Sequence, residues 1–133
     1  MDITTAKEKA MAAVEAARAE LTEISLDIHA HPELALQERR ASKLLADHVE
    51  AHGFSVDRWA HGIETAFIGT WGEGPVTIAY LLEYDALPDI GHACGHNLIA
   101  IAGVGAGVGL RAGLEGRAGT LVILGSPAEE GGA

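Results

Sequence analysis

The sequence has little cysteine, few basic residues and no long uninterrupted apolar run, and each of these features excludes a class of protein. It has 1 cysteine in 133 residues, so an internal disulfide is excluded. Lysine and arginine number 9 against 19 aspartates and glutamates, and the formal net charge is -10. Because no basic cluster is available to neutralise phosphates, we expect no nucleic-acid partner. The longest apolar run, residues 98–110, is shorter than a membrane span and interrupted by glycines, so we expect no membrane partner.

The beginning of the sequence lacks the apolar stretch of a secretory signal, because its first twenty residues are charged and rich in alanine. These absences predict a cytoplasmic protein. What is present favours a folded domain, since 48% of the residues are hydrophobic and 21% are charged. A chain of 133 residues can enclose one modest hydrophobic core.

Apolar residues at helical spacing predict two helices in the first part of the chain. The first is expected from about Thr5 to Ala30, with Thr5 and Glu8 in the pattern of a capping box. The second is expected from about Gln37 to His52. Gly53 follows it at the position where a left-handed C-terminal cap would fall.

Strand patterns follow, and they predict an α/β fold. Short strands are expected at residues 54–56 and 65–69 and, after a turn, at 76–82, whose apolar run is typical of a strand buried on both faces. A helix over 97–112 then precedes a strand over 120–124. The order predicts two N-terminal helices followed by a mixed sheet with a packed helix. Alternate glycines inside the last helix favour close packing on the sheet over a dinucleotide fingerprint, which needs a strand-turn-helix context.

Polar residues able to carry chemistry follow these strands. Asp85 comes after the apolar run, Cys94 and His96 lie just before the helix, and the pair Glu129 and Glu130 follows the last strand. Because the carboxyl ends of strands in α/β sheets meet at one edge, we expect these side chains to gather there. Thiolate, imidazole and carboxylate together form a ligand set for zinc-like ions. Such an ion lowers the pKa of bound water from ~15.7 to ~7, and a neighbouring carboxylate can then take the proton.

Other interpretations of the same residues remain open. A single cysteine is usually a small buried hydrophobe, and paired glutamates are usually solvated. Asp85 could cap a turn, and Tyr84 is expected to serve packing. Cys94 could instead be a nucleophile with His92 or His96 as its base, although the glutamate pair would then have no role. Outside this group, solvated positions are expected for His48, His52 and His61. His29 and His31 are expected to form hydrogen bonds with the last carbonyl groups of the first helix.

Four segments together resemble peptidase family M20, in the branch of p-aminobenzoyl-glutamate hydrolase and the aminoacylase-1-like dipeptidases. The matching stretches occur in the expected order over most of the chain, at residues 28–34, 82–88, 91–97 and 126–132. The resemblance implies part of a zinc-peptidase-like catalytic domain and a metal-dependent hydrolase of amide bonds. The implied substrates are N-acyl amino acids, dipeptides or aminobenzoyl-glutamate-like amides.

The resemblance also implies a role for each residue of the site. Cys94, His96 and Glu130 match metal ligands, Glu129 matches the general base that activates water, and Asp85 matches a carboxylate that orients the site. Two divalent ions, Zn²⁺ or Mn²⁺, are implied for the complete enzyme. Two positions depart from the common pattern. Many members have a histidine ligand where this chain has Glu83, and other members of the branch have aspartate where it has Asn97, which could cap the helix.

Length is the larger departure from the family. Full-length members are roughly three times longer, form homodimers and supply further histidine ligands, whereas every histidine here lies at or before His96. The sequence is therefore expected to be the N-terminal part of the catalytic domain, residues 1–133, without the lid or dimerisation domain. Two hypotheses follow. The motifs serve a metal-dependent amidohydrolase, or the 133-residue chain is an inactive fragment or partner-binding module with at most a partial metal site.

Overall fold

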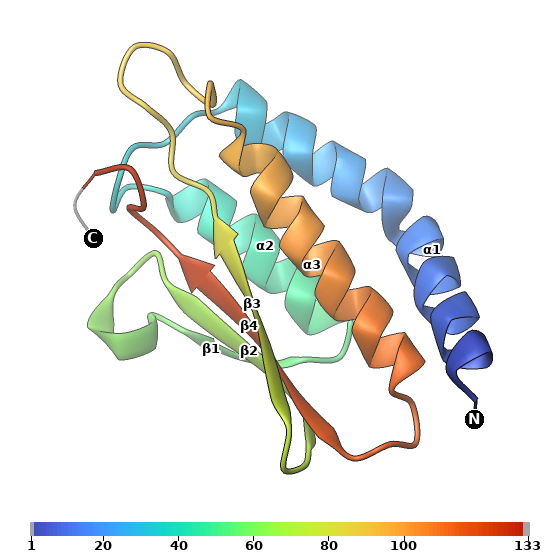
Figure 1. Cartoon of the computed structure of the whole chain (residues 1–133). Coiled ribbons are helices and arrows are strands. Elements are labelled where there is room, and N and C mark those ends of the chain that lie inside the picture. Colours follow the sequence, from blue (N-terminus) through green and yellow to red (C-terminus); the bar gives the residue numbers. More distant parts are fainter. Residues whose placement is uncertain (1, 132–133) are drawn as a thin grey trace.

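The chain was analysed as a computed structural model that describes residues 2–131. Within these residues the fold consists of three helices and four strands, together with one short 3-10 turn (Figure 1). In chain order they are α1 (Ile3–Ala30), α2 (Arg39–Ala51), β1 (Ser55–Arg58), η1 (Ala60–Gly62), β2 (Phe67–Glu73), β3 (Thr77–Glu83), α3 (His96–Gly113) and β4 (Gly119–Ser126).

The four strands form one mixed sheet in the order β1-β2-β4-β3. Strand β2 pairs antiparallel with β1 and with β4, whereas β3 pairs parallel with β4. A parallel pair needs a crossover connection, and α3 provides it. The α/β class, the two N-terminal helices and the mixed sheet with a packed helix are therefore confirmed.

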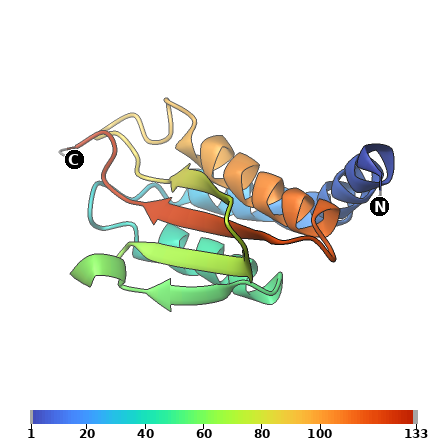
Figure 2. The ribbon, with the colours of Figure 1, turned by 60° about the horizontal axis from the view of Figure 1, so that its bottom comes forward.

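The hydrophobic core lies between the helices and one face of the sheet. Along β4, Leu121 and Ile123 are buried, while Val122 and Leu124, which alternate with them, are only half-buried. Helices α1 and α3 lie together on one side of the sheet in Figure 2, and α1, α2 and α3 all contribute side chains to a single core cluster. The opposite face carries no helix of the described residues. This arrangement fixes α3 firmly over the parallel pair of strands.

Strand β3 is not buried on both faces, so that prediction was wrong. It lies at the edge of the sheet, where Leu82 points into the core and is fully buried. Its neighbour Leu81 is 56% exposed, and Ile78 is 39% exposed. An apolar run does not distinguish one covered face from two, and here helices cover only one. The outer edge of β3 has no strand partner among residues 2–131.

The N-terminus of α1 also differs from its prediction. Asp2 is the N-cap, and its Oδ1 accepts a hydrogen bond of 3.0 Å from the Thr5 backbone N–H. The Thr5 hydroxyl donates to the same carboxylate, so Thr5 lies inside the helix and the predicted capping box with Glu8 does not form. A short aspartate side chain just before the first turn satisfies orphan N–H groups equally well. Gly53, after α2, has φ 81°, which confirms the left-handed cap.

The glycines of α3 allow the close packing that their spacing predicts. A Cβ at Gly103 would lie 2.8 Å from Leu82 Cδ1, and a Cβ at Gly107 would lie 2.6 Å from Ile123 Cδ1. Helix α3 therefore approaches β3 and β4 at distances that a larger residue would prevent. In the described part of the chain no helix is both long and apolar enough to cross a membrane.

Candidate metal centre

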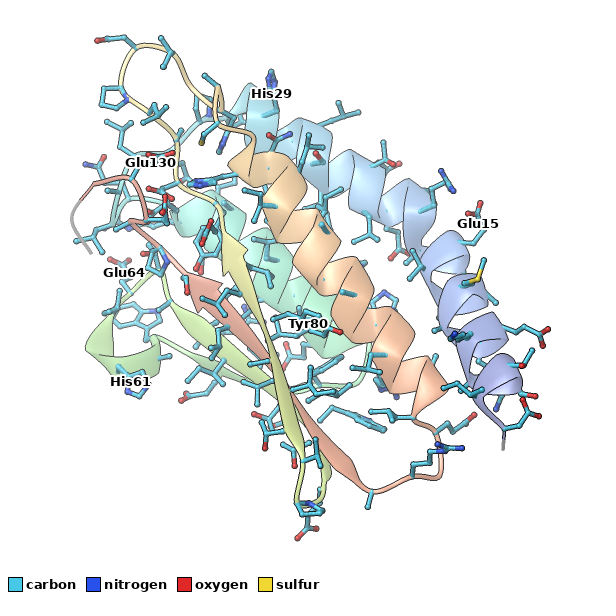
Figure 3. All side chains as sticks on the ribbon, viewed as in Figure 1. Glu15, His29, His61, Glu64, Tyr80 and Glu130 are labelled. Atoms are coloured by element: carbon cyan, nitrogen blue, oxygen red, sulfur yellow. The ribbon has the colours of Figure 1, made fainter. Side chains whose placement is uncertain are left out.

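The sheet brings the predicted site residues to one edge. Because β3 and β4 are parallel and Glu83 is paired in register with Ser126, both strands end at the same level. Asp85 follows the end of β3, and the Glu129–Glu130 pair follows the end of β4. Helix α3 begins at His96 beside these ends (Figure 1). Figure 3 shows Glu130 at this end of the molecule.

His96 is the centre of the cluster. Its side chain is 4% exposed, and its Nε2 faces three carboxylates: Glu83 Oε2 at 3.5 Å, Glu129 Oε2 at 3.6 Å and Glu130 Oε1 at 3.9 Å. Donor atoms of Cys94, His96 and Glu130 lie within 4.8 Å of one another. The structure thus brings together the five predicted residues and adds Glu83, whose role the sequence left open.

Asp85 fixes the orientation of the imidazole. It is fully buried, and its backbone carbonyl and its Oδ1 lie 2.9 Å and 3.0 Å from His96 Nδ1. The carbonyl oxygen can only accept, so Nδ1 is the donor of this hydrogen bond and Nε2 is the ring nitrogen that faces the carboxylates. Oδ1 lacks the geometry of a hydrogen bond despite its short distance, whereas Oδ2 accepts a bond of 2.9 Å from the Glu130 backbone N–H. Asp85 therefore holds the ring and the glutamate loop together and does not cap a turn.

The cluster has the composition of a cation site. Three carboxylates converge on one imidazole nitrogen, and in residues 2–131 they pair with His96 and with no lysine or arginine. Like charges placed this close repel unless a cation lies between them. Imidazole, thiol and carboxylate donors suit zinc-like divalent ions. The residues present therefore fit the metal that the sequence implied.

The thiol of Cys94 is not prepared to act as a free nucleophile. Partial burial and a hydrogen bond to Glu130 both raise the pKa of Cys94 above its ordinary value. A nucleophilic thiolate needs a lowered pKa, normally from a neighbouring cation. The interpretation of Cys94 as nucleophile loses support, and the interpretation of Cys94 as a small buried hydrophobe is wrong because the residue is exposed.

Two glutamates that sequence reasoning missed hold the site loops. Glu38 is fully buried, and its Oε1 accepts hydrogen bonds of 2.9 Å from the backbone N–H groups of Leu36 and of Ala128, next to Glu129. Glu33 accepts bonds from the Arg40 and Ala41 backbone at the start of α2. Glu38 directly precedes α2, where carboxylates are common, but that position does not distinguish a buried carboxylate from a solvated one.

The turn before α3 is built by glycine, and not by Asn97. Gly95 has φ 88° and is the N-cap, so a residue without a side chain makes the tight turn between Cys94 and His96. Asn97 does not cap the helix, so that prediction was wrong. Its amide donates to the Ser25 hydroxyl at 3.0 Å and thereby ties α3 to α1.

The remaining predictions for single residues have mixed outcomes. Tyr84 serves packing as expected: it is fully buried, and its hydroxyl donates to the Thr65 carbonyl. His31 Nδ1 lies 2.9 Å from the carbonyl of Asp27, as predicted for the end of α1. His61 is exposed, but His48 is only 8% exposed, because it lies between α1 and α2, so its solvated placement was wrong. Gly132, part of the last matching stretch, lies outside the described residues.

Comparisons with known proteins agree with the motifs. No protein-family model matches the chain. Xaa-Arg dipeptidase of Mus musculus is 41% identical over 141 residues, which cover 95% of this chain and 32% of the relative. One of the subunits of p-aminobenzoyl-glutamate hydrolase from Escherichia coli (strain K12) is 37% identical over 139 residues, which cover 90% of this chain and 29% of the relative. The chain thus spans about a third of the length of these curated relatives.

The fold is also found among solved structures. A Bacillus subtilis protein described as a dinuclear metal-binding peptidase of family M20 matches with a TM-score of 0.71 and 25% identity, over 87% of this chain and 36% of that one. In sequence and in fold, the chain is therefore a relative of the peptidase family M20 hydrolases, as its motifs predicted.

Proposed function

We propose that the His96 cluster forms one side of the active centre of a metal-dependent hydrolase of amide bonds. The single observation that carries the proposal is the convergence of Glu83, Glu129 and Glu130 on His96 Nε2, with Cys94 beside them and Asp85 behind the ring. The substrates proposed are N-acyl amino acids, dipeptides or aminobenzoyl-glutamate-like amides. The names of the relatives support this range, since one is a dipeptidase and another belongs to a hydrolase of p-aminobenzoyl-glutamate.

In this proposal Cys94, His96 and Glu130 hold the ion, and Zn²⁺ or Mn²⁺ is the proposed metal. The dinuclear metal binding described for the Bacillus subtilis structure supports a divalent ion and a second ion in the complete enzyme. Such an ion lowers the pKa of water and polarises a carbonyl oxygen. Asp85 keeps the proton on Nδ1 of His96, which leaves Nε2 free to bind.

Glu129 is the proposed general base. Its side chain is 49% exposed, whereas that of Glu130 is 29% exposed, so Glu129 is the more accessible carboxylate of the pair. An accessible carboxylate next to a less accessible ligand can accept a proton from an attacking water and pass it to the departing amine. The Glu38 hydrogen bond to the Ala128 backbone holds the loop that carries it.

We further propose that residues 1–133 are the N-terminal part of an M20-type catalytic domain, and that homodimers form in the full-length protein in the cytoplasm. The coverage of about a third of each relative supports the first statement. The unpaired outer edge of β3 is consistent with it, because a sheet edge of this kind accepts a further strand.

A second candidate function is a partial site for a single ion, without turnover. One observation favours it for the residues described: the two possible donor groups, Cys94 with Glu130 and Glu83 with Glu129, both depend on His96. Nδ1 of that ring faces Asp85, so the one remaining nitrogen can serve one ion at a time. A dinuclear centre needs further donors.

Metal analysis combined with an amidase assay separates these candidates. The chain and its variants Cys94→Ser and Glu130→Gln are each loaded with Zn²⁺ or Mn²⁺, and the number of bound ions is measured. Only ions that the chain binds and the variants lose are assigned to this centre. Hydrolysis of N-acyl amino acids and dipeptides is then measured. Two such ions with turnover support the hydrolase, and one ion without turnover supports the partial site. If neither variant loses an ion, both candidates are wrong.

A further inference from the structure

A second group of metal-binding side chains lies away from the sheet edge, between α1 and α2. It consists of Glu20 from α1, His48 from α2 and His52, the residue that ends α2. The two histidines are four residues apart and therefore lie on one face of the helix. Their ring centroids are 4.4 Å apart, with an angle of 59° between the ring planes.

The distances between the donor atoms of this group are longer than a hydrogen bond and closer to the distances between ligands that share an ion. Glu20 Oε2 lies 3.4 Å from His48 Nδ1 and 3.8 Å from His52 Nε2, and the three donor atoms are within 4.8 Å of one another. Donors bound tetrahedrally to zinc at about 2.0–2.1 Å are separated by about 3.3 Å. The separations of 3.4 Å and 3.8 Å from the Glu20 oxygen are therefore close to those of donors that share an ion.

His48 provides an independent reason to expect a ligand. Its side chain is 7% exposed, and its Nε2 is buried without a hydrogen-bond partner among the described residues. The unpaired Nε2 lies on the side of the ring away from Glu20, whereas Nδ1, which faces Glu20, is only loosely paired at 3.4 Å. At Nδ1 the buried ring has therefore lost hydration without full replacement. Glu20, in turn, pairs with no lysine or arginine within residues 2–131. Both partners thus have donor capacity left for an ion.

The surroundings attract cations. A groove of about 450 Å³ beside His48 is lined by further carboxylates, those of Glu23, Asp27 and Asp47. Arg40 pairs with Asp27 and Lys43 with Asp47, whereas Glu23 has no ion-pair partner in the described chain. Grooves lined by one sign of charge raise the local concentration of counter-ions, and the whole chain carries a formal charge of -10.

We propose that Glu20, His48 and His52 bind a divalent transition-metal ion at a second site, separate from the His96 cluster. Two imidazoles and one carboxylate suit zinc-like ions, with water in the remaining position. The ion would join α1 to the C-terminal end of α2. The competing explanation is a simple ion pair between Glu20 and a protonated histidine.

Titration of the chain with Zn²⁺, followed by NMR of the imidazole nitrogens, tests this site directly. The ring signals of His48 and His52 are expected to shift together and to saturate, and the His52→Asn spectrum assigns them. Glu20→Gln should weaken this binding at least about tenfold, since even groups behind metal ligands contribute about 10- to 100-fold. Glu23→Gln is the matched control, with the same chemical change three residues along the same helix, and should weaken binding far less than Glu20→Gln because Glu23 acts only through the charge of the groove.

Two results would overturn the proposal. The first is the absence of any saturable shift of the His48 and His52 signals while the ring of His96 responds to Zn²⁺. The second is an equal loss of affinity in Glu20→Gln and Glu23→Gln, which would indicate diffuse attraction by the acidic groove. Circular dichroism of each variant verifies that the helices are intact, and His61→Asn verifies that removal of an exposed histidine has no effect.

Discussion

Two buried histidines of this protein face carboxylates, and they differ in what lies behind the ring. Behind His96, the fully buried Asp85 occupies Nδ1, so Nε2 is directed at three glutamates. Behind His48, Nε2 has no hydrogen-bond partner among the described residues, and the ring meets a single exposed glutamate on the other side. A ligand that the protein orients in advance costs less to bind. The His96 cluster is therefore the stronger site, and the His48 cluster the weaker one.

The largest expected effect comes from Glu129, which distinguishes a catalytic centre from a mere ion site. Glu129→Gln should lower kcat/KM for amide hydrolysis by about 10²–10⁴-fold, the usual contribution of a general base, with Zn²⁺ affinity retained. Glu130→Gln, the adjacent matched change, should instead reduce Zn²⁺ affinity. Calorimetric titration and an amidase assay check both variants. Equal loss of the ion in the two would contradict the division of roles.

Asp85→Asn tests the contact that makes the two histidines different. The change removes the charge of a buried carboxylate that accepts a hydrogen bond from the Glu130 backbone, and hydrogen bonds to charged groups contribute about 1.5–3 kcal/mol of unfolding free energy. The equivalent change at the other cluster, Glu20→Gln, should alter it by no more than about 0.5 kcal/mol, because Glu20 is at the surface. Urea unfolding at pH 7 measures both. Similar losses in the two variants would show that Asp85 does not orient His96 as described.

Gly103→Ala tests how far the His96 cluster depends on the packing of α3. The new methyl group would lie 2.8 Å from Leu82 Cδ1 and 3.1 Å from the Leu81 carbonyl, which is backbone and cannot move away easily. Overpacking of this kind costs about 1–3 kcal/mol. At Gly105 the added Cβ would meet only Leu21 Cδ1 at 3.4 Å, so Gly105→Ala should be neutral or stabilising. Thermal unfolding compares the pair, and identical behaviour would contradict the close approach.

The smallest effect is expected at the rim of the second cluster. The hydrogen bond from Arg40 holds the pKa of Asp27 below its ordinary value. A lowered pKa contributes stability that is present above the unfolded value of about 3.9 and lost as the pH falls through the folded value. Asp27→Asn should therefore reduce the urea midpoint slightly at pH 7 and not at pH 2. A difference that persists at pH 2 would mean that Asp27 acts through packing.

Much of the His96 cluster could be predicted from the sequence, because parallel strands that end at one edge bring distant residues together. The motifs around Asp85, Cys94 and Glu130 needed only that rule and the family resemblance. The exposure of β3 could not be predicted, since an apolar run is the same whether helices cover one face or two. Nothing in the local sequence separates the buried Glu38 from a solvated glutamate, because its partners are backbone groups of Leu36 and Ala128.

The His48 cluster was missed for a related reason. Histidines four apart on a helix are common at surfaces, and the burial of His48 depends on how α1 packs across α2. Asn97 was mispredicted for the same reason. Gly95 is the N-cap of α3, and the Asn97 amide donates a hydrogen bond to Ser25 on α1. Contacts between elements far apart in sequence decided each of these outcomes.

The cation site of Cys94, His96 and Glu130 at the ends of β3 and β4 can be observed directly. The decisive measurement is a crystal of the chain grown with Zn²⁺ and recorded at the zinc absorption edge. We expect an anomalous peak about 2.0–2.1 Å from His96 Nε2 and about 2.3 Å from Cys94 Sγ. An anomalous map without a peak at His96, or with zinc bound only between Glu20, His48 and His52, would contradict this site.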